Sequence, residues 1–470
     1  MAWLPVSSRW PWAPEVLMVR IARRCISAII PYRWRAHWHI MPTKQPGSLR
    51  GIAMLAIVGG NLIDGTGAPA LQDAAVLIDG EHIIEVGPRP SVPVPEGAEV
   101  LDAAGQTIMP GLIDVHDHLA SGGYGLTGRW GMDEPGSLFN IRTAQVIEDT
   151  LAAGYTTVRD AGGLDAGFKM AVEEGLIKGP RLIVSINIMS PTGGIEDKVS
   201  GSGHRKVILG HDPLAPDGVA DGVDGVRAKV RELVRCGADQ IKFATTGGAS
   251  GRPGNGPLDQ AYALDEAKAL VDEAAALGRS TLCHAVGGTG LPIAIKAGAG
   301  SIEHGCYLAT DPDMLKMMAD QGTFFTPTFE VYDFHSTVSA PHIRVRAQAL
   351  MDIHILSVEL AIKEGVRIVA GTDAGGFVHG DNARELELMV EKGMSAPLAI
   401  QAATGYAAEC CGIGKDVGTI APGKLADILV VDGDPLQNIS VLRDRERLSL
   451  IMKGGEAYKN RLPVRELQPA

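Results

Sequence analysis

The sequence lacks the features that would place it in an unusual class of protein. Its six cysteines show no Cys-x-x-Cys spacing, and one pair, Cys410 and Cys411, is adjacent and awkward for a disulfide. We therefore expect a reducing, cytoplasmic location. There is no tandem repeat and no low-complexity tract. Hydrophobic residues make up 45% and charged residues 21%, which is typical of a globular protein and excludes a disordered or fibrous one.

Positive charge is also scarce outside one short stretch of the chain. The formal net charge is −12, and the first 50 residues hold eight Lys or Arg against Glu15 alone. The remaining chain is therefore more acidic than the whole. An acidic protein of this kind repels phosphate groups, so we expect neither nucleic acid nor an anionic membrane as a partner.

Residues 1–53 form an atypical N-terminal extension. Five of the six tryptophans lie there, and arginines interrupt every apolar run, which leaves neither a signal-peptide core nor a membrane span. Three interpretations stay open: a start codon chosen upstream of Met41 or Met54, a targeting leader, or an arm used in assembly.

The two ends of the remaining chain have a similar pattern of residues. Short β-branched runs cut by Gly and Asp-Gly turns occur from residue 56, in AIVGGNLIDGTG, and return in GTIAPGKLADILVVDGDP. Residues 54–107 and 413–470 are therefore predicted to form one small β-sandwich built from both chain ends.

The middle of the chain, residues 108–412, alternates short apolar runs with helical patterns, which predicts parallel βα units. Helices are expected at 226–237 and 265–278. Eight apolar runs favour a closed TIM-type (β/α)₈ barrel, an α/β fold. The eight runs cover residues 108–116, 156–162, 181–187, 240–246, 280–286, 301–305, 323–329 and 367–375.

Histidines and an aspartate stand at the ends of several predicted strands. In VHDHL, His116 and His118 point to the same side of the strand because alternate residues share a face. Such a pair alone is weak evidence for a metal. However, His284, His304 and Asp373 end three other predicted strands, at the rim where barrel enzymes keep their active sites. This convergence favours metal ligands over core histidines and a helix N-cap.

Lys242 lies within another predicted strand, residues 240–246, and has two interpretations. Most lysines extend their ammonium group outward to water. A lysine desolvated beside metal ions instead loses its proton and can react with carbon dioxide, giving a carbamate whose two oxygens bridge two ions.

Seven stretches carry a resemblance to a known family, in the expected order: MPGLIDVHDHL, TTVRDAGG, QIKFATTGG, HAVGG, SIEHG, AGTDAGG and GTIAPGKLADILVVDGDP. From about Leu55 to Tyr458 the chain resembles the amidohydrolase superfamily. The likeness is to its imidazolonepropionase-like group, which includes prolidase-like and ochratoxin-type amidohydrolases. These relatives imply a hydrolase of C–N bonds and a homo-oligomer.

The resemblance implies two divalent ions held by six ligands: His116, His118 and Asp373 for the more buried ion, His284 and His304 for the second, and Lys242, as a carbamate, for the bridge. Zinc suits this nitrogen and oxygen set, and manganese or cobalt also fit it. In the expected reaction, a metal-bound hydroxide attacks an amide carbonyl. Asp373 is the expected catalytic residue, accepting the proton and passing it to the leaving nitrogen.

The substrate class is less constrained. We expect an N-acyl amino acid, a dipeptide or a similar small molecule. Ile195 stands where dipeptidase-like relatives have a histidine, so an N-aryl or N-alkyl urea or carbamate is the alternative. Deamination of a heterocycle is weakened by Lys242, because such deaminases use one metal. A non-catalytic assembly protein with this fold is disfavoured because all six ligands are present.

Residues just beyond strand ends are candidates for contacts with the substrate, since barrel specificity lies in those loops. They are Ile195, Tyr332, His335, His379 and Asn382. By strand alternation Glu303 and Cys283 face away from the neighbouring histidines, which predicts a supporting role for Glu303 and a buried thiol for Cys283.

Overall fold

The computed structural model describes residues 54–121, 135–199, 202–203, 216–251 and 254–465. The atypical extension, residues 1–53, lies outside the described residues, as do His204 and His211.

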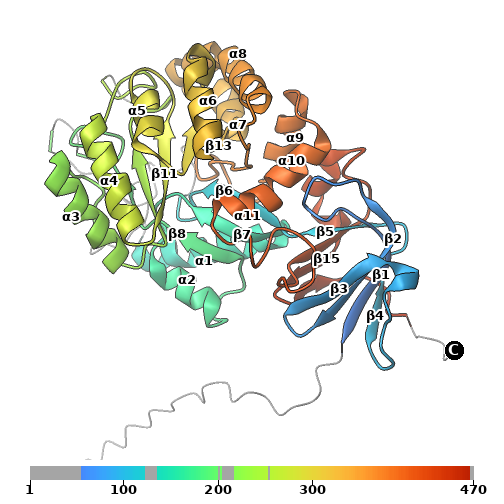
Figure 1. The fold of residues 1–470 in the computed structure, drawn as a ribbon. Coiled ribbons are helices and arrows are strands. Elements are labelled where there is room, and N and C mark those ends of the chain that lie inside the picture. Colours follow the sequence, from blue (N-terminus) through green and yellow to red (C-terminus); the bar gives the residue numbers. More distant parts are fainter. Residues whose placement is uncertain (1–53, 122–134, 200–201, 204–215, 252–253, 466–470) are drawn as a thin grey trace, which may run out of the picture. The chain divides into compact units, whose positions relative to one another are not determined.

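Both ends of the described chain meet in one mixed sheet of eight strands (Figure 1). Its order is β16-β15-β14-β5-β1-β2-β3, with β4 paired to β1. The strands are β1 (Leu55–Leu62), β2 (Leu71–Asp79), β3 (His82–Pro88), β4 (Glu99–Asp102), β5 (Thr107–Pro110), β14 (Ile428–Val431), β15 (Leu448–Lys453) and β16 (Glu456–Asn460).

This sheet joins both chain ends, as expected, but the expected sandwich is not confirmed. Strand β5 pairs parallel with β1 and antiparallel with β14, so the N-terminal and C-terminal hairpins join edge to edge. A sandwich would need two facing sheets, and these are not confirmed in the described chain. The first of the eight predicted barrel runs is also divided, because β5 belongs to this sheet while β6 (Leu112–Asp117) begins the next one.

Parallel strands in the middle of the chain form two further sheets. One has the order β6-β7-β8 and the other β13-β12-β11-β10-β9. Their paired strands run parallel, as βα units predict. The new strands are β7 (Tyr155–Asp160), β8 (Arg181–Val184), β9 (Ile188–Met189), β10 (Gln240–Ala244), β11 (Ser280–Ala285), β12 (Ser301–His304) and β13 (Phe324–Thr326).

The eighth predicted run, residues 367–375, is not a continuous strand in the structure. It contributes isolated bridges, from Ile368 to Phe325 of β13 and from Ala374 to Asp117 of β6. Its regular extension is broken because Asp373 adopts a left-handed φ of 56°. Among the described strands no closed eight-stranded ring is assigned, and this segment bridges β13 of one sheet to β6 of the other.

Helices cover the outer side of the parallel strands, and α3 and α4 pack against each other (Figure 1). The predicted helix at 226–237 corresponds to α3, whose Val226, Val230 and Leu233 are buried, and the one at 265–278 corresponds to α4. Gly278 follows α4 with a left-handed φ of 68°, as a helix stop requires. Among the described residues, none of the helices has the length and apolar composition needed to cross a bilayer.

The α-helices are α1 (Gly136–Ala152), α2 (Ala166–Glu173), α3 (Gly222–Arg235), α4 (Leu264–Ala276), α5 (Gly290–Ala297), α6 (Pro312–Gln321), α7 (Phe329–Thr337), α8 (Pro341–Lys363), α9 (Arg384–Glu391), α10 (Ala396–Ala402) and α11 (Gly405–Cys410). Short 3₁₀ helices are η1 (Arg89–Ser91), η2 (Leu308–Thr310), η3 (Ile439–Arg443) and η4 (Arg445–Arg447).

Candidate metal centre

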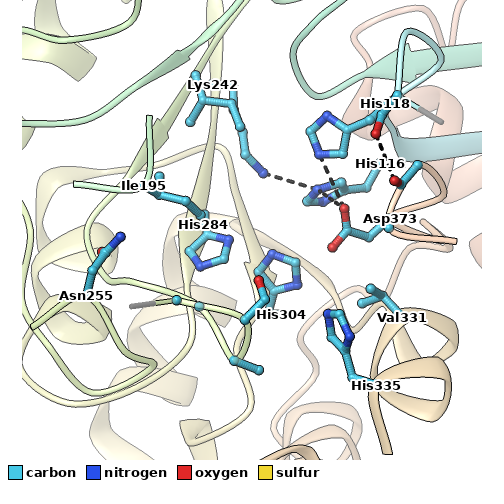
Figure 2. A pocket seen from close by; sticks show the side chains of 18 of the residues that line it. His116, His118, Ile195, Lys242, Asn255, His284, His304, Val331, His335 and Asp373 are labelled. Atoms are coloured by element: carbon cyan, nitrogen blue, oxygen red, sulfur yellow. Dashed lines mark hydrogen bonds and ion pairs between the residues drawn. The ribbon is translucent and has the colours of Figure 1, made fainter. Parts of the chain in front are cut away.

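The end of β6 brings together three side chains that can bind one cation. His116 and His118 extend to the same side of the strand, and Asp373 approaches them from the bridging segment (Figure 2). Asp373 Oδ1 lies 3.2 Å from His118 Nε2 and 3.6 Å from His116 Nε2. One ligand atom from each residue lies within 4.8 Å of the others, which is compatible with a shared ion.

Lys242 reaches the same place from β10. Its Nζ lies 3.2 Å from Nε2 of His116, and the residue is only 1% exposed. Burial lowers the pKa of the Lys242 ammonium to about 8. A substantial fraction of this amine is therefore neutral near physiological pH, unlike that of an exposed lysine.

His284 and His304 come from the neighbouring parallel strands β11 and β12, in which His284 is opposite Glu303 and Ala285 is opposite His304. Their ring centroids are 4.3 Å apart, and the His304 ring is 5.1 Å from that of His116. His304 has a left-handed φ of 74°, rare for a residue with a side chain. Such backbone strain is characteristic of functional sites.

Each of the four imidazoles has one ring nitrogen engaged by a partner behind it. Nδ1 of His116 lies 2.6 Å from Glu303 Oε2, Nδ1 of His118 is 2.7 Å from the Gly162 carbonyl oxygen, and Nδ1 of His304 is 2.8 Å from Thr328 Oγ1. For His284 the engaged atom is Nε2, 3.1 Å from the Gly247 carbonyl oxygen. The other nitrogen of each ring is left to serve as a ligand.

The protonation states also suit a cation. Burial lowers the pKa of His116 to about 4 and that of His284 to about 3, so both rings are neutral at neutral pH. Burial opposes ionisation of Asp373, but the hydrogen bond with His118 and the nearby His116, His118 and Lys242 together outweigh it and hold the carboxyl pKa at about 2. Although burial opposes it, the contact with Asp373 raises the pKa of His118. The neutral rings of His116 and His284, a carboxylate and a lysine of lowered pKa are donors that suit a hydrolytic metal site.

A cavity of about 520 Å³ opens onto these groups. All six predicted ligands line it, as do three of the predicted substrate contacts, Ile195, Tyr332 and His335. In Figure 2, Ile195 lies on one side of the pocket and Asp373, Val331 and His335 lie on the other. The cavity is large enough for a small organic molecule.

A model of the Amidohydrolase family matches residues 107–457. The chain belongs to this family. It is accordingly a hydrolase that acts on amide or other C–N bonds.

The similar proteins cover most of this amidohydrolase. Ochratoxinase of Aspergillus niger is 32% identical over 423 residues, which are 86% of each chain. Imidazolonepropionase of Streptomyces griseus is 25% identical, over 86% of this chain and 97% of its own. A crystal structure of a prolidase complexed with N-methylphosphonate-L-proline has a TM-score of 0.78 and 33% identity, over 87% of this chain and 100% of its own. This likeness implies a TIM-type barrel, although the described strands are assigned to separate sheets.

Two of the predicted substrate contacts are placed elsewhere in the amidohydrolase. His379 Nε2 lies 2.9 Å from Asp117 Oδ1, and Asn382 Nδ2 donates to Asp117 and Asp114, each at 2.9 Å. Neither residue lines the described cavity. Asp117 points away from the metal ligands, as strand alternation predicts, and these polar residues satisfy its buried carboxylate.

The sequence analysis missed an ion pair behind the metal ligands. Arg159, in β7, donates from Nη2 to Glu303 Oε1 at 2.9 Å, and Glu303 in turn holds His116. Both residues are buried. Burial by itself raises the pKa of the Glu303 carboxyl, but the neighbouring Arg159 holds that pKa below its usual range. Glu303 thus has the supporting role predicted for it. An arginine inside the apolar run TTVRDAG was the available signal for its partner.

Cys283 is buried behind His284 and contacts Thr245 Oγ1 at 3.5 Å. Burial raises the pKa of its thiol to about 12. A thiol that stays protonated is a poor nucleophile. The structure therefore agrees with the prediction of a buried structural thiol.

Proposed function

We propose that this chain is a binuclear metal-dependent amidohydrolase that cleaves an amide bond in an N-acyl amino acid, a dipeptide or a similar small molecule. The observation that carries the proposal is the convergence of all six predicted ligands on one cavity. Ochratoxinase and the prolidase structure, both above 30% identity, support hydrolysis of an amide bond in a small molecule.

Lys242 would serve as the bridge after carboxylation. In its neutral form Nζ attacks the carbon of carbon dioxide, a C–N bond forms, and a proton is lost to solvent, which leaves a carbamate anion. The lowered pKa makes the neutral amine available, and the 3.2 Å separation from His116 Nε2 places the group beside the first ligand cluster. When bound, two zinc ions would activate water and polarise the substrate carbonyl.

Asp373 is suited to move the proton. Its carboxylate is ionised at neutral pH and lines the cavity beside His118. It can accept a proton from the attacking water and deliver it to the leaving nitrogen, so that the amine departs neutral. The left-handed backbone of Asp373, tied by its N–H to the His116 carbonyl oxygen at 2.6 Å, keeps this carboxylate in place.

Hydrolysis of an N-aryl or N-alkyl urea or carbamate is the second candidate. Apolar Ile195 lines the pocket, and such substrates carry little charge. Parallel assays of acyl amino acids, dipeptides, ureas and carbamates distinguish the two, because only one class will be turned over efficiently.

The test of the metal centre is elemental analysis of the purified protein and of Lys242→Ala, with bicarbonate in the buffer. We expect about two ions per chain in the wild type and a sharp fall in the variant. Lys268→Ala, at an exposed lysine of α4, is the matched control and should keep both ions. One ion per chain, unaffected by loss of Lys242, would refute the bridged centre.

A further inference from the structure

Helix α7 forms one wall of the pocket beside His304. Val331 and His335 of this helix line the cavity (Figure 2), as does Tyr332, whose ring centroid lies 5.9 Å from that of His304. Thr328 precedes the helix, and its Oγ1 lies 2.8 Å from Nδ1 of His304. A neutral imidazole that donates from Nδ1 to this hydroxyl keeps the lone pair of Nε2 for an ion. The position of the Thr328 hydroxyl therefore affects how His304 can bind a metal.

Thr328 does not use its hydroxyl to cap the helix that follows it. A threonine in this place commonly accepts a hydrogen bond from an N–H group of the first helical turn. Within the described chain, Thr328 forms no such side-chain bond to α7. Its backbone lies in the left-handed region, with a φ of 53°, which is strained for a β-branched residue. The first N–H groups of α7 thus need another acceptor.

Glu385, in α9, supplies the missing acceptors. Its Oε1 accepts from Phe329 N at 3.0 Å and its Oε2 accepts from Glu330 N at 2.7 Å. Helices α7 and α9 pack against each other, and Glu385 is fully buried without lining the cavity. Burial raises the pKa of this carboxyl to about 8, whereas the two N–H groups act against that shift. The N-terminus of α7 is therefore satisfied from a neighbouring helix.

The segment that carries Glu385 is itself anchored to strand β6. Asn382 Nδ2 donates to Asp114 Oδ2 and to Asp117 Oδ2, each at 2.9 Å. Strand β6 also carries the first two histidine ligands. One short segment thus contacts the strand of these ligands and, through the start of α7, the residue that holds His304.

We propose that Glu385 is a positioning residue for the second ion: by capping α7 it leaves the Thr328 hydroxyl to hold His304. Without this carboxylate, the N–H groups of Phe329 and Glu330 would compete for that hydroxyl, and the Nδ1 proton of His304 would lose its acceptor. The ring would then adopt orientations and tautomers that do not present Nε2 to an ion. This inference rests on the proposed binuclear centre and adds to it a residue outside the cavity lining.

A double-mutant cycle tests whether Glu385 acts through Thr328. Chelator competition at a pH above 8 measures the dissociation constant of each ion for the wild type, Glu385→Gln, Thr328→Val and the double variant. Each single change should weaken the binding of one ion by about 10–100-fold and leave the other ion bound. The double variant should be no weaker than the more affected single variant, because both changes remove the same support. Multiplied effects, or unchanged affinity in Glu385→Gln, would overturn the inference.

Glu266→Gln is the matched control. Glu266 also accepts from two backbone N–H groups, those of Gly222 at 2.7 Å and Ala263 at 2.9 Å, but it lies outside the pocket lining. This variant should keep both dissociation constants, and so should Thr328→Ser, which retains the hydroxyl. Thermal unfolding of the metal-free variants identifies loss of folding. If Glu385→Gln does not fold, Glu385→Asp takes its place in the cycle, because the shorter side chain withdraws the carboxylate from α7.

Nitrogen-15 NMR of the metal-free protein, labelled at histidine, separates this inference from the proposed function. The His304 signals are identified by their loss in His304→Gln. The Nδ1-protonated tautomer should predominate in the wild type and in Glu266→Gln, whereas Glu385→Gln should show a mixture of tautomers. A wild type that binds a single ion would refute the binuclear centre, and these spectra would then decide the role of Glu385. Unchanged His304 signals in Glu385→Gln would overturn the inference at either metal content.

Discussion

The two sides of the pocket are built differently. On the metal side, each histidine ring is held by a second residue, and His116 is tied through Glu303 to Arg159. On the other side, apolar Ile195 and the side chain of Asn255 line the cavity. The metal side comes from strand ends and the other side from loops. The difference indicates that the reaction depends on geometry fixed by the fold, whereas selectivity depends on groups left for the substrate.

The largest effect should come from Asp373, the charged group of the metal side that also faces the cavity. Asp373→Asn removes the proton acceptor at constant volume, so kcat should fall on the order of 10²-fold or more. Initial rates, normalised to bound metal, measure this loss. Asp272→Asn, at an exposed aspartate of α4, is the control and should keep wild-type rates. A fully active Asp373→Asn enzyme would refute the assigned role.

A smaller effect should follow from breaking the support of His116. Glu303→Gln removes the carboxylate that orients the ring and leaves Arg159 without its buried ion partner. Metal affinity should weaken by about 10–100-fold, the usual result of losing such a partner. Competition with a chelator measures the dissociation constant independently of turnover.

The matched control for this change is Glu409→Gln, where the ion pair with Arg367 is exposed and is expected to contribute little. Unchanged metal affinity in Glu303→Gln would show that metal binding does not need the residues that hold the histidine rings. The contrast between the two sides of the pocket would then be wrong.

The smallest effect concerns stability behind the metal side. His354, in α8, is buried against Phe329 and Tyr332, and burial lowers its pKa to about 3. The unfolded chain takes up a proton at His354 below about pH 6.5, but the folded protein does not until about pH 3. His354 thus contributes a loss of stability as pH falls through this window.

The His354→Leu variant has no imidazole at this position, so it does not share this loss of stability at low pH. Its free energy of unfolding should therefore increase relative to that of the wild type, making the variant comparatively more stable, on going from about pH 7.5 to about pH 5. Urea unfolding of the metal-free proteins at both pH values measures the change. His342→Leu, at an exposed histidine of the same helix, should show no such trend. A constant difference for His354→Leu would contradict the assigned burial effect.

Strand alternation accounts for much of what could be predicted. It placed His116 and His118 together, turned Asp117 toward the opposite side, and assigned Glu303 a supporting position, because side-chain direction in a strand has a period of two. The neighbouring parallel strands β11 and β12 then supply His284 and His304. Beyond the strand ends, local pattern carries no distance information. His379 and Asn382 follow the expected strand end, yet they satisfy Asp117 and do not line the cavity.

The sequence by itself determined the order of βα units, the donor residues at strand ends and the family to which the chain belongs, because periodicity and motif spacing are local properties. Only the tertiary structure decided the joining of both chain ends in one sheet, the bridging role of residues 367–374 and the Arg159–Glu303–His116 connection. It also decided that Asn255 lies in the lining of the pocket. These features depend on residues far apart in the chain, and their contacts are set by packing and by the need to satisfy buried polar groups.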